Sequence, residues 1–289
     1  MTARLLLLGY PKAGKTGAIA ALANAGRKVR YLDFDNNIDS LRQYTNKDSR
    51  KNIDRVPCLD RLDFKKFGTG DIGIDLTSFV SWPTMVAALE KWPSDGSNPS
   101  EWDNNNVLVF DSLTAMAQAR WRATLKLNAR RDARMNYKLV QDQIADLLTL
   151  IRDNIRCPVV VLAHIQIVGP DFHVDEDIED INLKEKILYK KLQGAQIIDP
   201  YFGPVSVGQK GAQVLPSLFS GVALLHASDM GRFIYTTPRN GFHLAVPVPG
   251  LDKELPISTG LATLINAWAP IPKSKAASPP QAESLETTE

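Results

Sequence analysis

The residues with the clearest chemical meaning form a short glycine-containing segment near the N-terminus. Residues 9–16 read Gly-Tyr-Pro-Lys-Ala-Gly-Lys-Thr, which matches the pattern G-x-x-x-x-G-K-[ST] at every fixed position. In such a loop the glycines let successive backbone N–H groups point at phosphate oxygens, the lysine adds a positive charge, and the threonine hydroxyl can ligate Mg²⁺. The segment therefore predicts a nucleoside-triphosphate site. Its predicted binding residues are Gly9, Tyr10, Pro11, Lys12, Ala13, Gly14, Lys15, Thr16 and Gly17.

Carboxylates at the ends of two further apolar runs have the chemistry needed beside this loop. Asp111 follows the run 107–110, and we expect it to hold Mg²⁺ together with Thr16, although an aspartate here can also simply cap the next helix. Asp33 and Asp35 are two residues apart at the end of a second predicted strand, so strand alternation places both on one face. Hydrolysis needs a group that polarises the attacking water. We expect Asp35 to be that group and keep Asp33 as the alternative, while a plain turn over residues 35–37 would need no catalysis.

A third set of polar residues follows the apolar run 158–163. His164 and Gln166 stand at its end, where a side chain can contact the terminal phosphate and transmit its loss to the next loop. A histidine that is merely satisfied at a strand end is the alternative.

The elements that must position these residues alternate between strands and helices. Apolar runs predict strands at 4–8, 29–34, 107–110, 158–164, 219–226 and 232–237. Helical patterns are found at 15–25, 84–92 and 113–155, the last with a break near 128–132. The alternation predicts an α/β fold with a mostly parallel sheet flanked by helices. We expect one domain over residues 1–268, with insertions at about 40–106 and 167–213 and a disordered tail at 269–289.

Composition limits the class of protein. The chain has 289 residues, of which 44% are hydrophobic and 23% charged, the balance of a globular protein with a real core. The net charge of +2 excludes a globally basic nucleic-acid coat protein and an acidic disordered chain. Two cysteines, Cys58 and Cys157, are too few for a disulfide scaffold or a four-cysteine zinc site, and no apolar run reaches the roughly 18 residues of a membrane span. We therefore expect a cytoplasmic protein with no membrane partner.

In the order of these motifs the sequence resembles the RecA-like recombinase and helicase ATPases, and especially small phage-encoded RecA-like ATP-binding proteins linked to single-strand annealing. The likeness covers about residues 1–240 and rests on the P-loop, the acidic strand tip at 31–39, the Walker B-like segment 109–112 and the polar segment 164–166. It implies ATP as the nucleotide, Mg²⁺ as the metal and a RecA-like P-loop core with late antiparallel strands. Asp35 stands where the family carries a water-activating glutamate.

The resemblance also implies two loops that bind single-stranded DNA. The first falls at about 120–138, where seven cations accompany one acid, and Trp121 and Tyr137 there are predicted to stack on bases. The second corresponds to about 167–213, of which only the later, lysine-containing half suits nucleic acid. A solvated basic face, or a contact with an acidic neighbouring subunit, is the alternative explanation for the first cluster. The predicted phosphate contacts are Arg120, Arg122, Lys126, Arg130, Arg131 and Arg134.

RecA-like ATPases often complete their site with a cation from a neighbouring subunit. Arg232 and Arg239 lie near the late strands and are predicted to stabilise charge on the transferred phosphoryl group. Surface arginines on a hairpin are the alternative. If the first interpretation holds, the active form is a homo-oligomeric ring or filament.

Two functions follow from these observations. The first is an ATPase that couples hydrolysis to single-stranded DNA in phage-type recombination or replication, in the bacterial host cytoplasm if the protein is phage-encoded. The second is a nucleotide-dependent switch or loader that acts on a recombination or replication protein and hydrolyses ATP slowly. The basic cluster favours the first, whereas the aspartate at position 35 and the acidic run 175–180 leave room for the second. A P-loop kinase of a small metabolite fits the long helix and late strands poorly.

Overall fold

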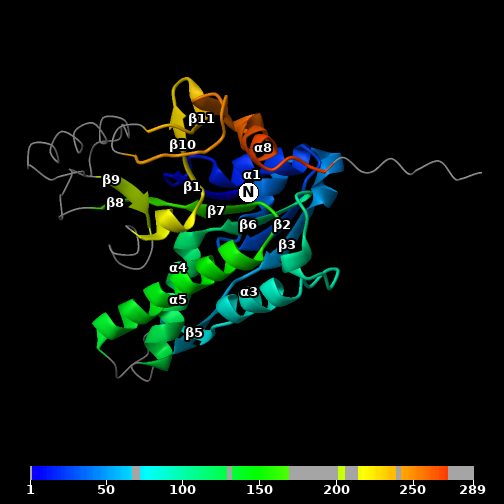
Figure 1. Ribbon diagram of the computed structural model, residues 1–289. Coiled ribbons are helices and arrows are strands. Elements are labelled where there is room, and N and C mark those ends of the chain that lie inside the picture. Colours follow the sequence, from blue (N-terminus) through cyan, green and yellow to red (C-terminus); the bar gives the residue numbers. More distant parts are fainter. Residues whose placement is uncertain are drawn as a thin grey trace, which may run out of the picture.

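The computed structural model describes residues 2–66, 72–128, 132–168, 201–205, 214–238 and 242–272 of the chain. Its centre is an eight-stranded sheet in the order β12-β11-β10-β1-β7-β6-β2-β3 (Figure 1). Neighbouring strands from β10 to β3 are parallel, whereas β11 and β12 are antiparallel to their neighbours, which confirms the predicted fold class. The strands are β1 (Arg4–Gly9), β2 (Lys28–Asp33), β3 (Ile53–Pro57), β6 (Asn106–Asp111), β7 (Val159–Ala163), β10 (Gly221–Ser228), β11 (Gly231–Tyr235) and β12 (Glu254–Pro256).

Helices cover both faces of this sheet (Figure 1). One face packs against α1 (Lys15–Asn24), α2 (Ile38–Tyr44) and α8 (Ile257–Trp268). The opposite face packs against α3 (Ser81–Glu90), α4 (Leu113–Leu127) and α5 (Ala133–Asn154). Short 3-10 helices lie at Lys47–Asn52, Pro99–Glu101 and Leu215–Leu218. Two separate hairpins pair β4 (Arg61–Lys66) with β5 (Ile72–Ser78) and β8 (Ile165–Val168) with β9 (Tyr201–Pro204).

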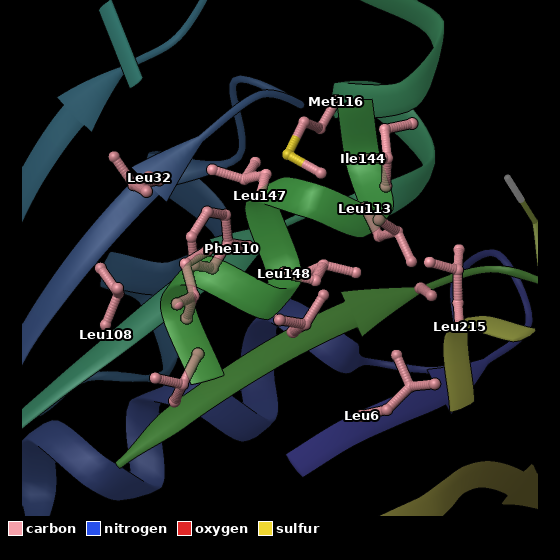
Figure 2. Close-up of a cluster of buried hydrophobic side chains, with 14 of the residues drawn as sticks. Leu6, Leu32, Leu108, Phe110, Leu113, Met116, Ile144, Leu147, Leu148 and Leu215 are labelled. Carbon is pink, nitrogen blue, oxygen red and sulfur yellow. The ribbon is translucent and has the colours of Figure 1, made fainter. Parts of the chain in front are cut away.

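The apolar strands are continuous because both sides of the sheet are buried. In β1, Leu6 and Leu8 belong to the core under α4 and α5, whereas Leu5 and Leu7 belong to the core under α1 and α8. This alternation is the period of two that a strand imposes. Figure 2 shows the first core, in which strand and helix side chains meet. Labelled there are Leu6, Leu32, Leu108, Phe110, Leu113, Met116, Ile144, Leu147, Leu148 and Leu215.

The predicted break in the long helical region is confirmed, since α4 ends at Leu127 and α5 begins at Ala133. A capping side chain supports the start of each helix. The Ser112 hydroxyl accepts the N–H of Ala115 at 3.2 Å, and the Asp132 carboxylate accepts the N–H of Arg134 at 2.9 Å. These are N-capping bonds, which satisfy amide groups that have no partner inside the helix.

Two parts of the fold differ from the sequence-based expectation. Residues 40–106 were expected to be an insertion, but β3 from this region is the edge strand of the main sheet and α3 packs on the sheet's face. Helix α8 was not expected at all, yet it packs on α1. The buried Arg27 holds the C-terminal end of α8 by donating to the Asn266 side chain at 2.8 Å and to the Ala269 carbonyl at 2.6 Å. Most of the predicted second loop and the tail from 273 lie outside the described residues. Within the described ranges, none of the helices is long and apolar enough to cross a membrane.

The strand order determines where the predicted chemistry meets. Strand β7 lies between β1 and β6, and β2 follows β6. These four strands are parallel, so their C-terminal ends share one edge of the sheet. In open α/β sheets that edge is where ligands bind. It carries the glycine-containing loop after β1, His164 after β7, Asp111 at the end of β6 and Asp33 at the end of β2.

Candidate nucleotide site

The loop after β1 turns sharply into α1, and its glycines are required by the space around them. Gly14 adopts a φ of 103°, a conformation that L side chains rarely take, and an added Cβ would lie 2.9 Å from Cδ1 of Ile257. At Gly9 an added Cβ would lie 3.0 Å from the carbonyl oxygen of Leu225. Helix α1 begins at Lys15, so its N-terminal amides and its positive dipole end face the loop.

Lys15 is buried, and three polar atoms hold its ammonium group over the loop. Its Nζ donates to the carbonyls of Gly9 and Tyr10 at 2.8 and 2.9 Å and lies 3.1 Å from Nδ1 of His164. Burial lowers the pKa of Lys15 to about 8, although the negative charges of Asp111 and Asp35 oppose this shift. The side chain is therefore still mainly cationic at pH 7, and a phosphate group bound next to the ammonium group would raise its pKa again.

Thr16 and Asp111 meet where the sequence predicts a metal site. The Thr16 hydroxyl donates to Oδ2 of Asp111 at 2.8 Å, and the hydroxyl of the buried Tyr31 donates to the same oxygen. Burial raises the pKa of Asp111 to about 6, while these two hydrogen bonds lower it. A hydroxyl and a carboxylate are the hard oxygen ligands that Mg²⁺ prefers, so the pair fits this ion. No group of three or more potential metal ligands occurs elsewhere in the described part of the chain.

The two aspartates of the second strand have different surroundings. Asp33 is fully buried, accepts from Nε of Arg55 at 2.8 Å and accepts the N–H of Asn37 at 3.1 Å. Asp35 is exposed and lines the cavity beside the loop. The expectation that both lie on one strand face was wrong, because β2 ends at Asp33 and the chain turns through Asn36, which has a φ of 57°. Of these two aspartates, only Asp35 lines the cavity beside the loop.

Lys15, Thr16, Asp111 and Asp35 line one cavity of about 300 Å³. Arg232 of β11 also lines the cavity, and its Cδ would lie 3.3 Å from a Cβ added at Gly14. Arg232 was expected to serve a neighbouring subunit, but the structure places it in the cavity of its own chain. Among the described residues it has no ion pair. The lining is Lys12, Gly14, Lys15, Thr16, Gly17, Asp35, Asn37, Ser40, Tyr44, Asp111, His164 and Arg232.

A second cavity of about 310 Å³ continues from the first along α1. The two share Gly14, Gly17, Tyr44 and Arg232, and the second has mostly apolar walls. The Tyr44 ring lies close over α1, since a Cβ at Gly17 would be 3.2 Å from its Cδ2. Sequence patterns did not single out Tyr44, because no local motif marks a ring that reaches the loop from a separate helix.

His164 connects this cavity to the segment that follows β9. Burial and then the charge of Lys15 lower the pKa of the imidazole, which favours a neutral ring. An ammonium group can only donate, so Nδ1 accepts from Lys15. The backbone N–H of His164 donates to Oγ1 of Thr114 at 3.1 Å, and that hydroxyl donates to the carbonyl of Val205 at 3.1 Å. The N–H of Val205 donates to the His164 carbonyl at 2.7 Å. The side chain of Gln166 lies outside the described residues.

Comparison with known proteins agrees with the geometry of the loop. A family described as an AAA domain (AAA_24) matches residues 1–193 of this chain. The chain belongs to this family. Within this AAA domain family, the chain carries the P-loop described above.

The chain also compares as follows with curated proteins and with solved structures. A search of curated proteins gives no match for the AAA domain protein. Among solved structures it is similar to a prototypical ATPase from the type III secretion system of pathogenic bacteria, with 12% identity and a TM-score of 0.38. That similarity covers 78% of this chain and 52% of the other, so the chain spans about half the length of that ATPase.

The predicted DNA-contacting residues of the AAA domain protein fall into three groups. Arg120 already has partners, since its Nε donates to Gln143 at 2.6 Å and its guanidinium lies 5.0 Å from the Trp82 ring centre, which argues against its assignment to phosphate. Lys126 lies 5.0 Å from the Phe79 ring centre. Arg122 and Arg134 are exposed and have no side-chain partner in the described ranges. Arg130, Arg131 and the predicted catalytic Arg239 lie outside the described residues.

The two aromatic rings predicted to stack on bases instead stack on each other. Trp121 and Tyr137 have ring centres 4.0 Å apart and planes inclined by 20°. One ring face of each is therefore covered, and the pair joins α4 to α5. Tyr137 stays 42% exposed, so only its outer face is available to a base.

Proposed function

We propose that this AAA domain protein is an Mg²⁺-dependent ATPase whose hydrolysis is coupled to single-stranded DNA, in phage-type recombination or replication. One observation carries the proposal: a single cavity brings together Lys15, the Thr16–Asp111 pair, Asp35 and Arg232. These supply the phosphate-binding cation, the metal ligands, a carboxylate for water and a further cation, which are the parts that phosphoryl transfer requires.

The two continuous cavities support a placement of ATP. The triphosphate would lie in the cavity over the α1 N-terminus, where Lys15 exchanges its bonds to the Gly9 and Tyr10 carbonyls for phosphate oxygens. The nucleoside would lie in the second, more apolar cavity, with its base against the Tyr44 ring. Thr16 and Asp111 would hold Mg²⁺, which neutralises charge on the phosphates when bound.

Each remaining group has a role that follows from its position. Asp35 would orient and deprotonate the attacking water, a contribution of about 10²–10⁴ in rate for a well-placed general base. Arg232 would stabilise the charge that spreads over the transferred phosphoryl group. His164 would respond when Lys15 moves toward phosphate, because the two side chains are in contact. A ring or filament remains part of the proposal through the RecA-like resemblance alone.

DNA binding is supported by two exposed cations, Arg122 on α4 and Arg134 on α5, which have no side-chain partner in the described part of the chain. Lys126, which lies over the Phe79 ring, is one helical turn beyond Arg122. Neutralising phosphates with such side chains releases counterions and makes binding dependent on salt. A protein-directed switch is the second candidate. It is favoured by Leu127 and Met135, which are 76% and 61% exposed at the same end of the helix pair.

Steady-state ATP hydrolysis with and without single-stranded DNA tests the proposal, with Lys15→Ala as the blank. We expect Mg²⁺-dependent turnover that DNA stimulates and that loses its stimulation as salt rises. Turnover that is indifferent to DNA at every salt concentration would reject the DNA coupling and favour the protein-directed switch. Turnover that is unchanged in Lys15→Ala would reject the site itself.

A further inference from the structure

A third cavity, of about 260 Å³, lies on the other side of Asp35. Asp35 is the one residue that lines both this cavity and the nucleotide cavity. The third cavity is bounded by the tip of β2, the residues after β3, the start of α3 and one side of α4. Its lining residues are Phe34, Asp35, Cys58, Leu59, Asp60, Ser81, Ala115, Gln118, Ala119 and Arg122.

Most polar groups of this cavity are already engaged. Asp60 accepts the N–H of Ser81 at 3.0 Å. Burial raises the pKa of the Cys58 thiol to about 12, so it is a neutral group there. By contrast, Gln118 and Arg122 lie one turn apart on α4 and neither has a side-chain partner among the described residues. The cavity therefore offers one unpaired guanidinium and one unpaired amide as donors for an anion, while Asp35 and Asp60 are the carboxylates in its lining.

The charges around Asp35 make such an anion relevant to catalysis. Asp35 is exposed and has no hydrogen-bond partner in the described part of the chain, so its carboxylate can turn toward either cavity. An anion held by Arg122 repels a carboxylate in the same small space. On the opposite side the nucleotide cavity presents the cations of Lys15 and Arg232. Occupation of the third cavity thus favours the orientation in which Asp35 faces the nucleotide.

We propose that the third cavity is an activator site that takes one phosphodiester group of bound single-stranded DNA, with Arg122 and Gln118 as its donors and Asp35 as the residue it positions. This inference rests on the proposed coupling to DNA. Two observations favour this occupant. The cavity is smaller than the pockets that bind drug-sized ligands, so it has room for a single sugar-phosphate unit. Lys126, which lies over the Phe79 ring, is four residues beyond Arg122, so a second cation on the same side of α4 is close to the next phosphate of a strand that would leave the cavity there.

The test compares ATP hydrolysis at saturating oligothymidylate with hydrolysis without DNA, in four variants. Arg122→Ala removes the cation, and Gln118→Glu places a negative charge in the cavity. Arg122→Lys keeps the cation as a rescue. Arg156→Ala is the matched control, because Arg156 is also an exposed arginine and precedes β7 at the opposite edge of the sheet. Gln118 and Arg122 are both exposed on α4, so these changes leave the core untouched.

We expect the ratio of stimulated to unstimulated turnover to fall about tenfold or more in Arg122→Ala and Gln118→Glu, at the low end of what a positioned general base contributes. Arg122→Lys should keep most of the stimulation, and Arg156→Ala all of it. In parallel, fluorescence anisotropy should show that the salt dependence of DNA binding by Arg122→Ala falls by about 0.7 in log–log slope, the loss of one phosphate contact.

The outcomes separate the two proposals. If DNA stimulates the wild-type protein and both cavity variants equally, the activator site is refuted and the DNA-coupled ATPase stands. If DNA fails to stimulate the wild-type protein, the DNA coupling itself is refuted, and the assigned occupant falls with it. If Arg156→Ala loses as much stimulation as Arg122→Ala, the effect comes from net charge and the cavity has no special role.

Discussion

Replacing Asp111 by asparagine should make the nucleotide-free protein more stable, although the residue is central to the site. Asp111 is only 2% exposed, and burial raises its pKa from 3.8 to about 6. A difference of about 2 in pKa corresponds to about 3 kcal/mol, which is the cost of keeping this carboxylate charged in the fold at neutral pH. Asparagine keeps an oxygen for the hydroxyls of Thr16 and Tyr31 and removes the charge. Its amide group lacks an evident acceptor, which costs about 1–2 kcal/mol, so we expect a net gain of about 1–2 kcal/mol.

The sign of the pH dependence follows from the direction of the shift. The folded-state pKa of Asp111 is raised, so its contribution to stability is intact below pH 3.8 and is lost as pH rises through 6. The advantage of Asp111→Asn should therefore be largest above pH 6. By pH 5 Asp111 is mostly protonated in the folded protein, and the free energy by which it destabilises the fold falls to about half its value at pH 7.5.

Urea unfolding in EDTA without nucleotide, at pH 7.5 and pH 5, measures this effect. The matched control is Asp33→Asn, the same change in a buried aspartate of the neighbouring strand. Asp33 pairs with Arg55 at 2.8 Å, so its loss of charge should lower the free energy of unfolding by about 1–3 kcal/mol. The reasoning is refuted if Asp111→Asn is no more stable than wild type at pH 7.5, or if its advantage is the same at both pH values.

Three further changes test the geometry of the site. Gly14→Ala should lower the free energy of unfolding by about 2 kcal/mol or more, because the alanine must adopt a φ of 103° and meets Ile257 at 2.9 Å; thermal unfolding that is unchanged would contradict this. Arg232→Ala should lower turnover per chain by the same factor at every protein concentration, since the arginine lines the cavity of its own chain. If mixing with wild-type subunits restored the turnover of the variant chains, the arginine would act across an interface instead. Thr114→Val removes the link between His164 and Val205 and should cost about 1–3 kcal/mol, with faster hydrogen exchange at the His164 amide as the readout.

Elements with an uninterrupted apolar pattern could be predicted from the sequence, whereas elements held by distant partners could not. Strands β1, β6 and β7 lie within two residues of their predicted ends, because a strand that is buried on both faces requires a continuous apolar run in the sequence. Edge strand β3 contains Asp54 and Arg55, which pair with Arg30 and with Asp33 across the sheet, so its local pattern is polar. Helix α8 carries a glycine that weakens its own propensity, and packing against α1 stabilises it.

The same distinction applies to the site. The phosphate-binding loop is a local sequence motif, so its residues could be identified from the sequence even though Ile257 and Leu225, far away in the chain, limit the space around its glycines. The choice between Asp33 and Asp35 depends on where β2 ends and on Arg55, a residue of another strand. The position of Arg232 depends on the sheet order, in which β11 reaches the loop through β10, and no spacing in the sequence encodes that order.

The central claim is that Asp35 activates water for a nucleotide held by Lys15, Thr16 and Asp111. The most direct test measures two quantities in Asp35→Asn, the affinity for a fluorescent ATP analogue with Mg²⁺ and the rate of phosphate release from ATP. We predict an affinity close to that of wild type and a release rate at least about 100-fold lower. An Asp35→Asn protein that releases phosphate at the wild-type rate would contradict the account and move the water-activating role to another group.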